Sequence, residues 1–85
     1  MQSTIALIVK YIPATNTKGS RVSLHFPRFR KRKFIPFNSM YNSTSAVALA
    51  YLEFNGIFPV AEAEGKNGED ILLISFDQIV NVLEL

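Results

Sequence analysis

The sequence contains no cysteine and no tryptophan, and it has a single histidine, His25. Without cysteine, disulfide bonds and zinc sites built on thiolates are excluded. One histidine cannot form a zinc site alone, and His25 has no neighbouring partner for general acid–base catalysis. Because no nucleophile–base pair and no set of metal ligands can be assembled, we expect no enzymatic activity, no cofactor and no bound metal.

Long hydrophobic runs are also absent. No stretch approaches the roughly 20 apolar residues that span a bilayer. The apolar run Ile5–Val9 has neither the preceding charges nor the following cleavage site of a signal peptide. We therefore expect a soluble, cytoplasmic protein without a membrane partner. Eighty-five residues are expected to form one domain, residues 1–85, with a small core.

Acidic residues are absent from the first half of the chain. Eight of the nine Lys and Arg lie between Lys10 and Lys33, whereas all seven Asp and Glu lie from Glu53 onward. The net charge of +2 therefore conceals a strongly basic first half and an acidic second half. A concentration of like charge attracts phosphates and acidic surfaces, so we expect the first half to bind an anion.

The periodicity of the apolar residues predicts an α+β fold, with a mostly antiparallel sheet in the element order β-β-β-α-β-β and a short C-terminal helical turn. We expect strands at Ile5–Ile12, Arg21–Phe26, Phe34–Phe37, Ile57–Ala63 and Ile71–Phe76. Pro36 favours an edge position for the third of these strands, since proline lacks the N–H that a central strand needs.

One main helix is expected to follow the third strand and to pack on a face of the sheet. Asn42 and Ser43 are the strongest candidates for its N-terminal cap, and Asn55-Gly56 for its end. The helical face that we expect to cover the sheet consists of Val47, Ala50, Tyr51 and Phe54. Near the end of the chain, Asn67-Gly68 predicts a hairpin turn.

The loop between the first two strands is the most unusual local feature. It combines three hydroxyls, an amide, two cations and a glycine, from Thr15, Asn16, Thr17, Lys18, Gly19, Ser20 and Arg21. A glycine with a positive φ lets backbone N–H groups approach an anion, while the hydroxyls and cations add donors and charge. The alternative is an ordinary loop whose side chains bond to their own backbone. It is not a Walker loop, because the first glycine and the following helix are missing.

Residues 27–37 interleave basic and aromatic side chains. The bases Arg28, Arg30, Lys31, Arg32 and Lys33 are expected in a turn or hairpin tip, together with the aromatic residues Phe29, Phe34 and Phe37. Basic side chains neutralise phosphates and exposed aromatic rings stack on unpaired bases, a combination that suits single-stranded nucleic acid. The alternative is a solvated turn whose phenylalanines point into the core.

Acidic residues flank the expected last hairpin, at Glu62, Glu64, Glu69 and Asp70. Carboxylates could bind a divalent cation, but the spacing matches no calcium loop. We expect these charges to be solvated, or to meet the basic half of a second copy of the chain.

The segment Val9–Arg21, with the sequence VKYIPATNTKGSR, resembles the opening of short, largely uncharacterised proteins encoded by bacteriophages and plasmids. Those proteins are similar in later plan, with an alanine-rich helix and a closing hairpin, which Ala46–Ala50 and Ile71–Ile74 match here. The chain departs from them in its basic segment at residues 28–33 and in lacking a tryptophan near the helix end. The resemblance implies a mobile element in a host cell, and it transfers no activity and no site residue.

Three hypotheses follow. The leading one is a non-enzymatic accessory protein of a phage or related element that binds nucleic acid through its basic half. The second is a host-defence antagonist that sequesters a nucleotide signal or masks a host protein. The third is a structural component of a virion or of its assembly. In addition, the 48% hydrophobic content and the apolar residues on both faces of Ile5–Ile12 predict a homo-oligomer, with a dimer as the leading candidate.

Overall fold

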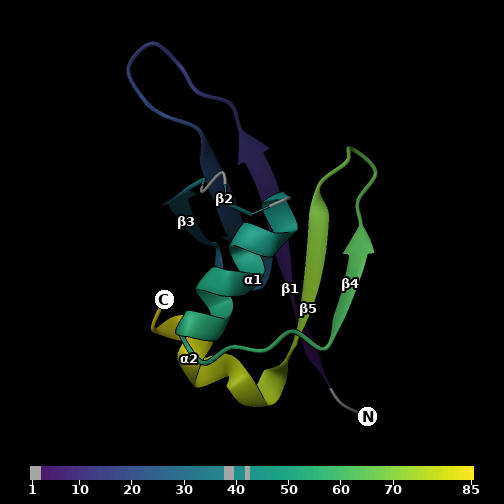
Figure 1. Cartoon of the computed structure of the whole chain (residues 1–85). Coiled ribbons are helices and arrows are strands. Elements are labelled where there is room, and N and C mark those ends of the chain that lie inside the picture. The colour runs from purple at the N-terminus through teal and green to yellow at the C-terminus, as the bar shows by residue number, and fades with distance from the viewer. Residues whose placement is uncertain (1–2, 38–39, 42) are drawn as a thin grey trace.

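A five-stranded antiparallel sheet forms the body of the molecule, with the strand order β3-β2-β1-β5-β4. The computed structural model describes residues 3–37, 40–41 and 43–85 (Figure 1). The strands are β1 (Thr4–Ile12), β2 (Arg21–Phe26), β3 (Lys31–Pro36), β4 (Ala61–Glu64) and β5 (Asp70–Ser75). The helices are α1 (Thr44–Phe54) and α2 (Ile79–Leu83), and two 3-10 turns are η1 (Pro27–Phe29) and η2 (Phe76–Gln78). The predicted α+β fold is confirmed.

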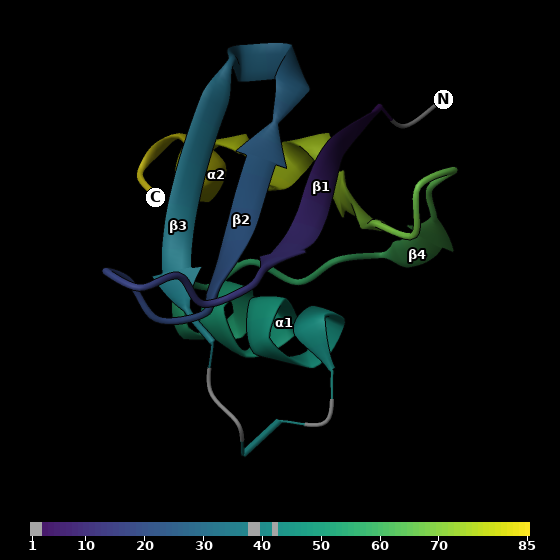
Figure 2. The same cartoon turned by 90° about the horizontal axis from the view of Figure 1, so that it is seen from above.

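Both helices lie on the same side of the sheet. In Figure 1, α1 and α2 lie in front of the strands, and Figure 2, seen from above, shows α2 behind β2 and β3. Strand residues point alternately to the two faces. In β1, β2 and β5, eight residues of one parity are fully buried: Ile5, Leu7, Val9, Val22, Leu24, Phe26, Leu72 and Ile74. They pack with Val47, Ala48 and Leu52 of α1 and Val82 of α2. We call this the helix side, and the other surface of the sheet the open face.

Helix α1 begins at one of the predicted caps. The Ser43 Oγ accepts a hydrogen bond from the Ala46 N–H at 3.2 Å, which satisfies a donor that the first turn leaves without a partner. Asn42, the other predicted cap, lies outside the described residues. No helix in the described part of the chain is long and apolar enough to cross a membrane.

The buried face of α1 differs from the predicted one. Val47 and Tyr51 face the core, but Phe54 is 89% exposed and Leu52 is fully buried. The reason is the way the helix ends: Gly56 has a φ of 77°, its N–H bonds to the Glu53 carbonyl, and the Ile57 N–H bonds to the Leu52 carbonyl at 2.9 Å. This pair of bonds is a Schellman motif, which brings the residue after the glycine against the last turn. Ile57, fully buried, therefore closes the end of the core in place of Phe54.

Two strands begin more than one residue away from their predicted starts, and the other strand boundaries lie within one residue of the prediction. Strand β4 begins at Ala61 instead of Ile57, because the backbone of Phe58 is occupied: its N–H donates to the Gln78 Oε1 at 2.7 Å, and its carbonyl accepts from the Gln78 Nε2 at 2.9 Å. Strand β3 begins at Lys31 instead of Phe34, because the chain reverses within η1 and at Arg30, whose φ of 52° is left-handed. The last hairpin turns at Gly68, with a φ of 81°, as predicted.

Replacement of Leu52 tests the corrected helix face. Leu52→Ala should lower the free energy of unfolding by about 2–5 kcal/mol, because it removes buried methyl groups and leaves a cavity. Phe54→Ala should change it by less than about 0.5 kcal/mol, because the ring is exposed. Urea unfolding followed by circular dichroism measures both variants, and equal losses would show that Phe54 belongs to the core.

Candidate nucleic-acid interface

The open face of the sheet carries charge of one sign. By alternation from the buried residues, it presents Lys10 on β1, Arg21 on β2 and Arg32 on β3. The three acids of the strands, Glu62, Glu64 and Asp70, belong to the helix side, since Glu62 aligns with the buried Leu72 and Glu64 with Asp70. Within the described residues, no Lys or Arg forms an ion pair with a carboxylate. The open face is therefore positive and is not neutralised by the chain itself.

The strand register gathers polar and aromatic side chains on the β1–β3 half of this face. Lys10 aligns with Ser23, and Ser23 aligns with Phe34, which forms one row across three strands. The adjacent row runs from Ile8 through His25 to Arg32. The β4–β5 half of the open face is apolar, with Ala61, Ala63, Ile71 and Leu73. The charged and aromatic groups thus form a cluster instead of spreading over the whole face.

Arg21 and Phe34 form the centre of this cluster. The guanidinium carbon of Arg21 lies 5.7 Å from the centroid of the Phe34 ring, and Phe34 is 48% exposed. The Arg21 Nε is buried and has no hydrogen-bond partner among the described residues. A buried donor without an acceptor is unfavourable, and an external ligand cannot reach this atom in the present arrangement, so Arg21 would contribute to anion binding through its positive charge.

A hollow of about 360 Å³ connects this pair with the loop that sequence analysis singled out. Its walls are formed by Lys18, Gly19, Ser20, Arg21, Phe34, Ile35 and Pro36. The β1–β2 loop extends beyond the end of the sheet (Figure 1), and its last residues return along β3. Four of the predicted anion-binding residues, Lys18, Gly19, Ser20 and Arg21, therefore share one concave surface with one of the predicted stacking residues, Phe34.

The first part of the loop is closed on itself. The Thr15 N–H donates to the Lys18 carbonyl at 2.8 Å, and the Lys18 N–H donates to the Thr15 Oγ1 at 3.1 Å. These two amides serve the turn, and Thr15, Asn16 and Thr17 do not line the hollow. The expected positive φ of Gly19 is wrong, because the glycines with positive φ in the described part of the chain are Gly56 and Gly68. The loop therefore offers side-chain charge to an anion and does not depend on a special glycine geometry.

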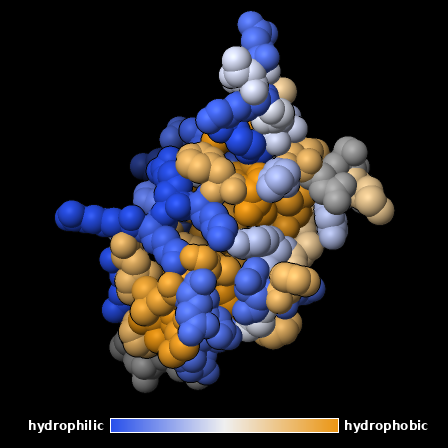
Figure 3. All heavy atoms as spheres, turned by 90° about the vertical axis from the view of Figure 1, so that its left-hand side faces the viewer, coloured by the Kyte–Doolittle hydropathy of each residue, from blue (hydrophilic) through white to orange (hydrophobic). Residues whose placement is uncertain are grey.

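The basic side chains of residues 28–33 do not form one cluster. One binds the end of a helix, two contact aromatic rings, and two are exposed. Lys31 donates from its Nζ to the Leu83 carbonyl at 2.9 Å, where it compensates the negative end of α2. The Nζ of Lys33 lies 5.7 Å from the Tyr51 ring centroid, and the Arg28 guanidinium lies 4.8 Å from that of Phe76. Arg30, at the turn, and Arg32, on the open face, are exposed. Figure 3, which views the molecule from its β3 side, shows hydrophilic side chains projecting beside exposed hydrophobic atoms.

The three phenylalanines proposed for base stacking also separate. Phe29 and Phe37 are partly buried and pack against the core. Phe37 in addition meets the Tyr11 ring edge to face, with the centroids 5.3 Å apart and an interplanar angle of 80°. Phe34 alone of the three has an exposed ring, because it lies on the open face.

Lys10 and Ser23 were not among the predicted binding residues, and for His25 the sequence excluded only general acid–base catalysis. The alternation within each strand placed Ser23 and His25 on the same face as Arg21, but only the register between strands brings them beside Lys10 and Phe34. The signal that could have found Lys10 is its parity, because it lies one residue from Val9 and therefore points away from the core.

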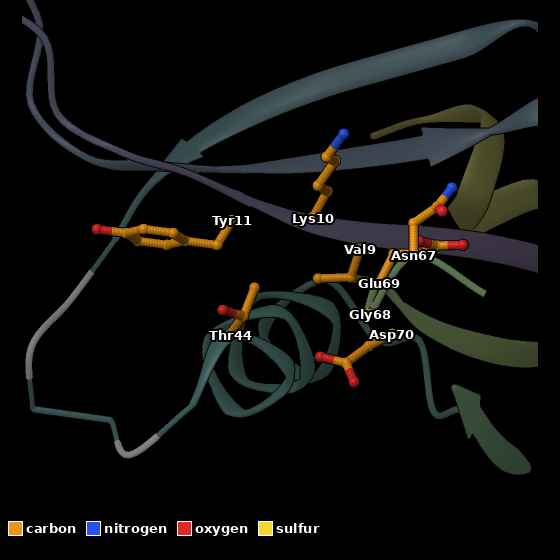
Figure 4. Close-up of a pocket in the computed structure, with 8 residues that line it drawn as sticks. All are labelled: Val9, Lys10, Tyr11, Thr44, Asn67, Gly68, Glu69 and Asp70. Carbon is orange, nitrogen blue, oxygen red and sulfur yellow. The ribbon is translucent and has the colours of Figure 1, made fainter. Parts of the chain in front are cut away.

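A second hollow, of about 200 Å³, lies between the end of β1, the start of α1 and the last hairpin (Figure 4). Its charged lining residues are Lys10, Glu69 and Asp70. In Figure 4, Lys10 and Asp70 point away from each other on opposite sides of β1. Two carboxylates against one cation make this hollow unsuitable for a phosphate. Among the residues with described positions, no group of three or more His, Cys, Asp or Glu comes together to hold a metal ion.

No family model, curated protein or solved structure matches this chain. The assignment of the interface therefore depends on the geometry and charge of its own residues.

Substitution of two glycines tests whether the β1–β2 loop has ordinary backbone geometry. Gly19 lies in that loop, and Gly68 in the last hairpin serves as a position that requires glycine. Gly19→Ala should leave the free energy of unfolding within about 0.5 kcal/mol of the parent, because a Cβ there meets nothing within 4 Å and φ is not left-handed. Gly68→Ala should cost about 1 kcal/mol or more, because an L-residue is strained at its φ of 81°. Thermal unfolding measures both, and a larger loss for Gly19→Ala would restore the original interpretation of the loop.

Proposed function

We propose that this chain is a non-enzymatic protein that binds single-stranded nucleic acid on the open face of its sheet. The observation that carries the proposal is the pairing of the exposed Phe34 ring with the Arg21 guanidinium, at 5.7 Å, on a face whose strands bear cations and no carboxylate. Phe34 offers a surface for a base, and the cations around it offer partners for the phosphates on either side.

A single strand suits this surface better than a duplex. The bases of a duplex are stacked on one another and do not present a face to a protein ring, whereas an unpaired base can stack on Phe34. Such stacking contributes about 1–3 kcal/mol per base. If Lys10, Lys18, Arg21 and Arg32 each neutralise one phosphate, the logarithm of the binding constant should fall with the logarithm of the salt concentration with a slope of about −3.

We also propose that the protein comes from a mobile genetic element. The resemblance of Val9–Arg21 to phage and plasmid proteins supports a mobile element as its source. An accessory protein of such an element would meet single strands during replication or transfer of its genome. A sheet face with one stacking ring and scattered cations favours binding with little sequence preference, because every base has a face that can stack.

A free nucleotide is the second candidate ligand, and the hollow beside Arg21 favours it. Its volume of about 360 Å³ falls within the range of about 300–1,000 Å³ typical of small-molecule sites. Phe34 would hold the base and Lys18 and Arg21 the phosphates. This candidate corresponds to an antagonist that sequesters a nucleotide signal, and it predicts saturation at a defined stoichiometry with a weaker dependence on salt.

Fluorescence anisotropy with labelled single-stranded DNA and RNA tests the proposal at low salt. Phe34→Ala should weaken binding by about 5- to 150-fold, which corresponds to the loss of one stacked base. Arg32→Gln should weaken binding and reduce the magnitude of the salt slope by about 0.7. Absence of binding by the parent at low salt would disprove the proposal.

Matched variants control for exposure and charge. Phe54→Ala removes a ring that is exposed at the end of α1, away from the open face, and Lys66→Gln removes the one basic residue of the acidic half. Both should bind like the parent. If Phe34→Ala also binds like the parent while the Arg32 variant is weakened, the strand is held by charge without stacking. Tight, stoichiometric binding of mononucleotides with little binding of oligonucleotides would favour the second candidate.

A further inference from the structure

The two edge strands of the sheet carry opposite charge. The edge formed by β3 bears Lys31, Arg32 and Lys33, and the edge formed by β4 bears Glu62 and Glu64. All four residues of β4 are exposed, and within the described residues β4 pairs only with β5 and β3 only with β2. An unpaired strand edge is a template for pairing with another chain. The charges on an edge strand then determine which edge strand of another chain it can pair with.

The opposite charges lie on the same side of the sheet. Lys31 and Lys33 align with the buried Phe26 and Leu24, which places them on the helix side of β3. Glu62 and Glu64 occupy the helix side of β4, as their alignment with Leu72 and Asp70 shows. On the open face, the corresponding neighbours are Arg32 and Phe34 on β3 and the small Ala61 and Ala63 on β4.

Symmetry and charge together exclude most ways of joining two copies by their edges. A two-fold axis brings an edge against its own copy, which would pair lysines with lysines or glutamates with glutamates, and like charges directly opposite are destabilising. Joining β3 to β4 with one copy turned over would place the lysines and glutamates on opposite faces. Only a head-to-tail contact with both helix sides on the same face brings Glu62 and Glu64 beside Lys31 and Lys33.

We propose that copies of this chain associate head to tail, with the acidic edge β4 of one copy against the basic edge β3 of the next. Strands β3 and β4 both run parallel to β1, because each is separated from it by one antiparallel neighbour, so the new pairing is parallel. A head-to-tail contact leaves a free edge at each end and therefore adds further copies until a ring closes.

The contacts available at the two edges support this pairing. The Lys31 Nζ uses one of its three donors on the Leu83 carbonyl, which leaves two for a carboxylate. Beside β4, a hollow of about 230 Å³ lined by Leu49, Val60 and Glu62, among others, offers an apolar wall for the stem of a lysine. Because β4 is only four residues long, the contact should be weak and sensitive to salt.

This association is independent of nucleic-acid binding, and it concerns the edges instead of the open face. In the assembly, the open faces of successive copies would lie on one side and form a continuous surface. The association should therefore occur without any nucleic acid, and failure of the chain to bind nucleic acid would leave the proposal intact.

Sedimentation velocity of the full chain at increasing concentration, at low and at high salt, tests the proposal. At low salt the weight-average mass should rise with concentration beyond that of a dimer, and at high salt it should fall toward that of a monomer. Glu62→Lys with Glu64→Lys makes both edges basic, and it should lower the association constant by at least about tenfold. These side chains are exposed, so the variant should remain folded. Glu53→Lys with Asp77→Lys makes the same change in net charge at exposed acids outside the strands, and it should associate like the parent.

Complementation makes the test specific. Lys31→Glu with Lys33→Glu makes both edges acidic, and it should lower the association constant as well. Circular dichroism checks that this variant is folded. If the loss of the hydrogen bond from Lys31 prevents folding, Lys33→Glu alone takes its place. Mixing equal amounts of the variant with two basic edges (Glu62→Lys with Glu64→Lys) and the variant with two acidic edges (Lys31→Glu with Lys33→Glu) should restore association. A parent that stays monomeric at low salt, a closed dimer indifferent to the edge charges, or a mixture of folded variants that does not associate would each overturn the proposal.

Discussion

The structure depends on the burial of a single parity of residues in the central strands. Once Leu7 and Leu24 are covered by the helices, a shift of register by one residue would expose the whole core and bury the charges, so the register is strongly fixed. That constraint also determines the surface. It turns Lys10, Arg21 and Arg32 to the open face and the acids of β4 to the helix side, so the core dictates where each charge can act.

The sequence predicted the features that local physics controls. The bounds of β2 matched the expected Arg21–Phe26, the edge position of the strand with Pro36 was confirmed, and Ser43 and Gly56 mark the ends of the helix as expected. The alternation of apolar and polar residues, the missing N–H of proline and the capping preferences all act over a few residues. They can therefore be recognised in a single sequence.

The predictions were wrong where the local structure depends on contacts with residues that are distant in the sequence. The start of β4 depends on Gln78, 20 positions from Phe58, and the role of Lys31 depends on Leu83, 52 positions away. The candidate site could be predicted only in part for the same reason. Lys18, Arg21 and Phe34 were expected to bind or stack, but their shared hollow is formed by the pairing of β2 with β3. Composition alone could not separate the exposed Phe34 from Phe29 and Phe37, which pack against the core.

The order of the strands also has a consequence for folding during synthesis. Strand β1 is the first to be made, yet it lies at the centre of the sheet, between β2 and β5. At about 5–20 residues per second, several seconds pass between the synthesis of Ile12 and that of Ser75. Throughout that time the backbone N–H and C=O groups on the edge of β1 that awaits β5 have no strand partner. Solubility of the nascent chain therefore depends on the β1–β2–β3 hairpins and their repelling cations, which discourage pairing between neighbouring unfinished chains.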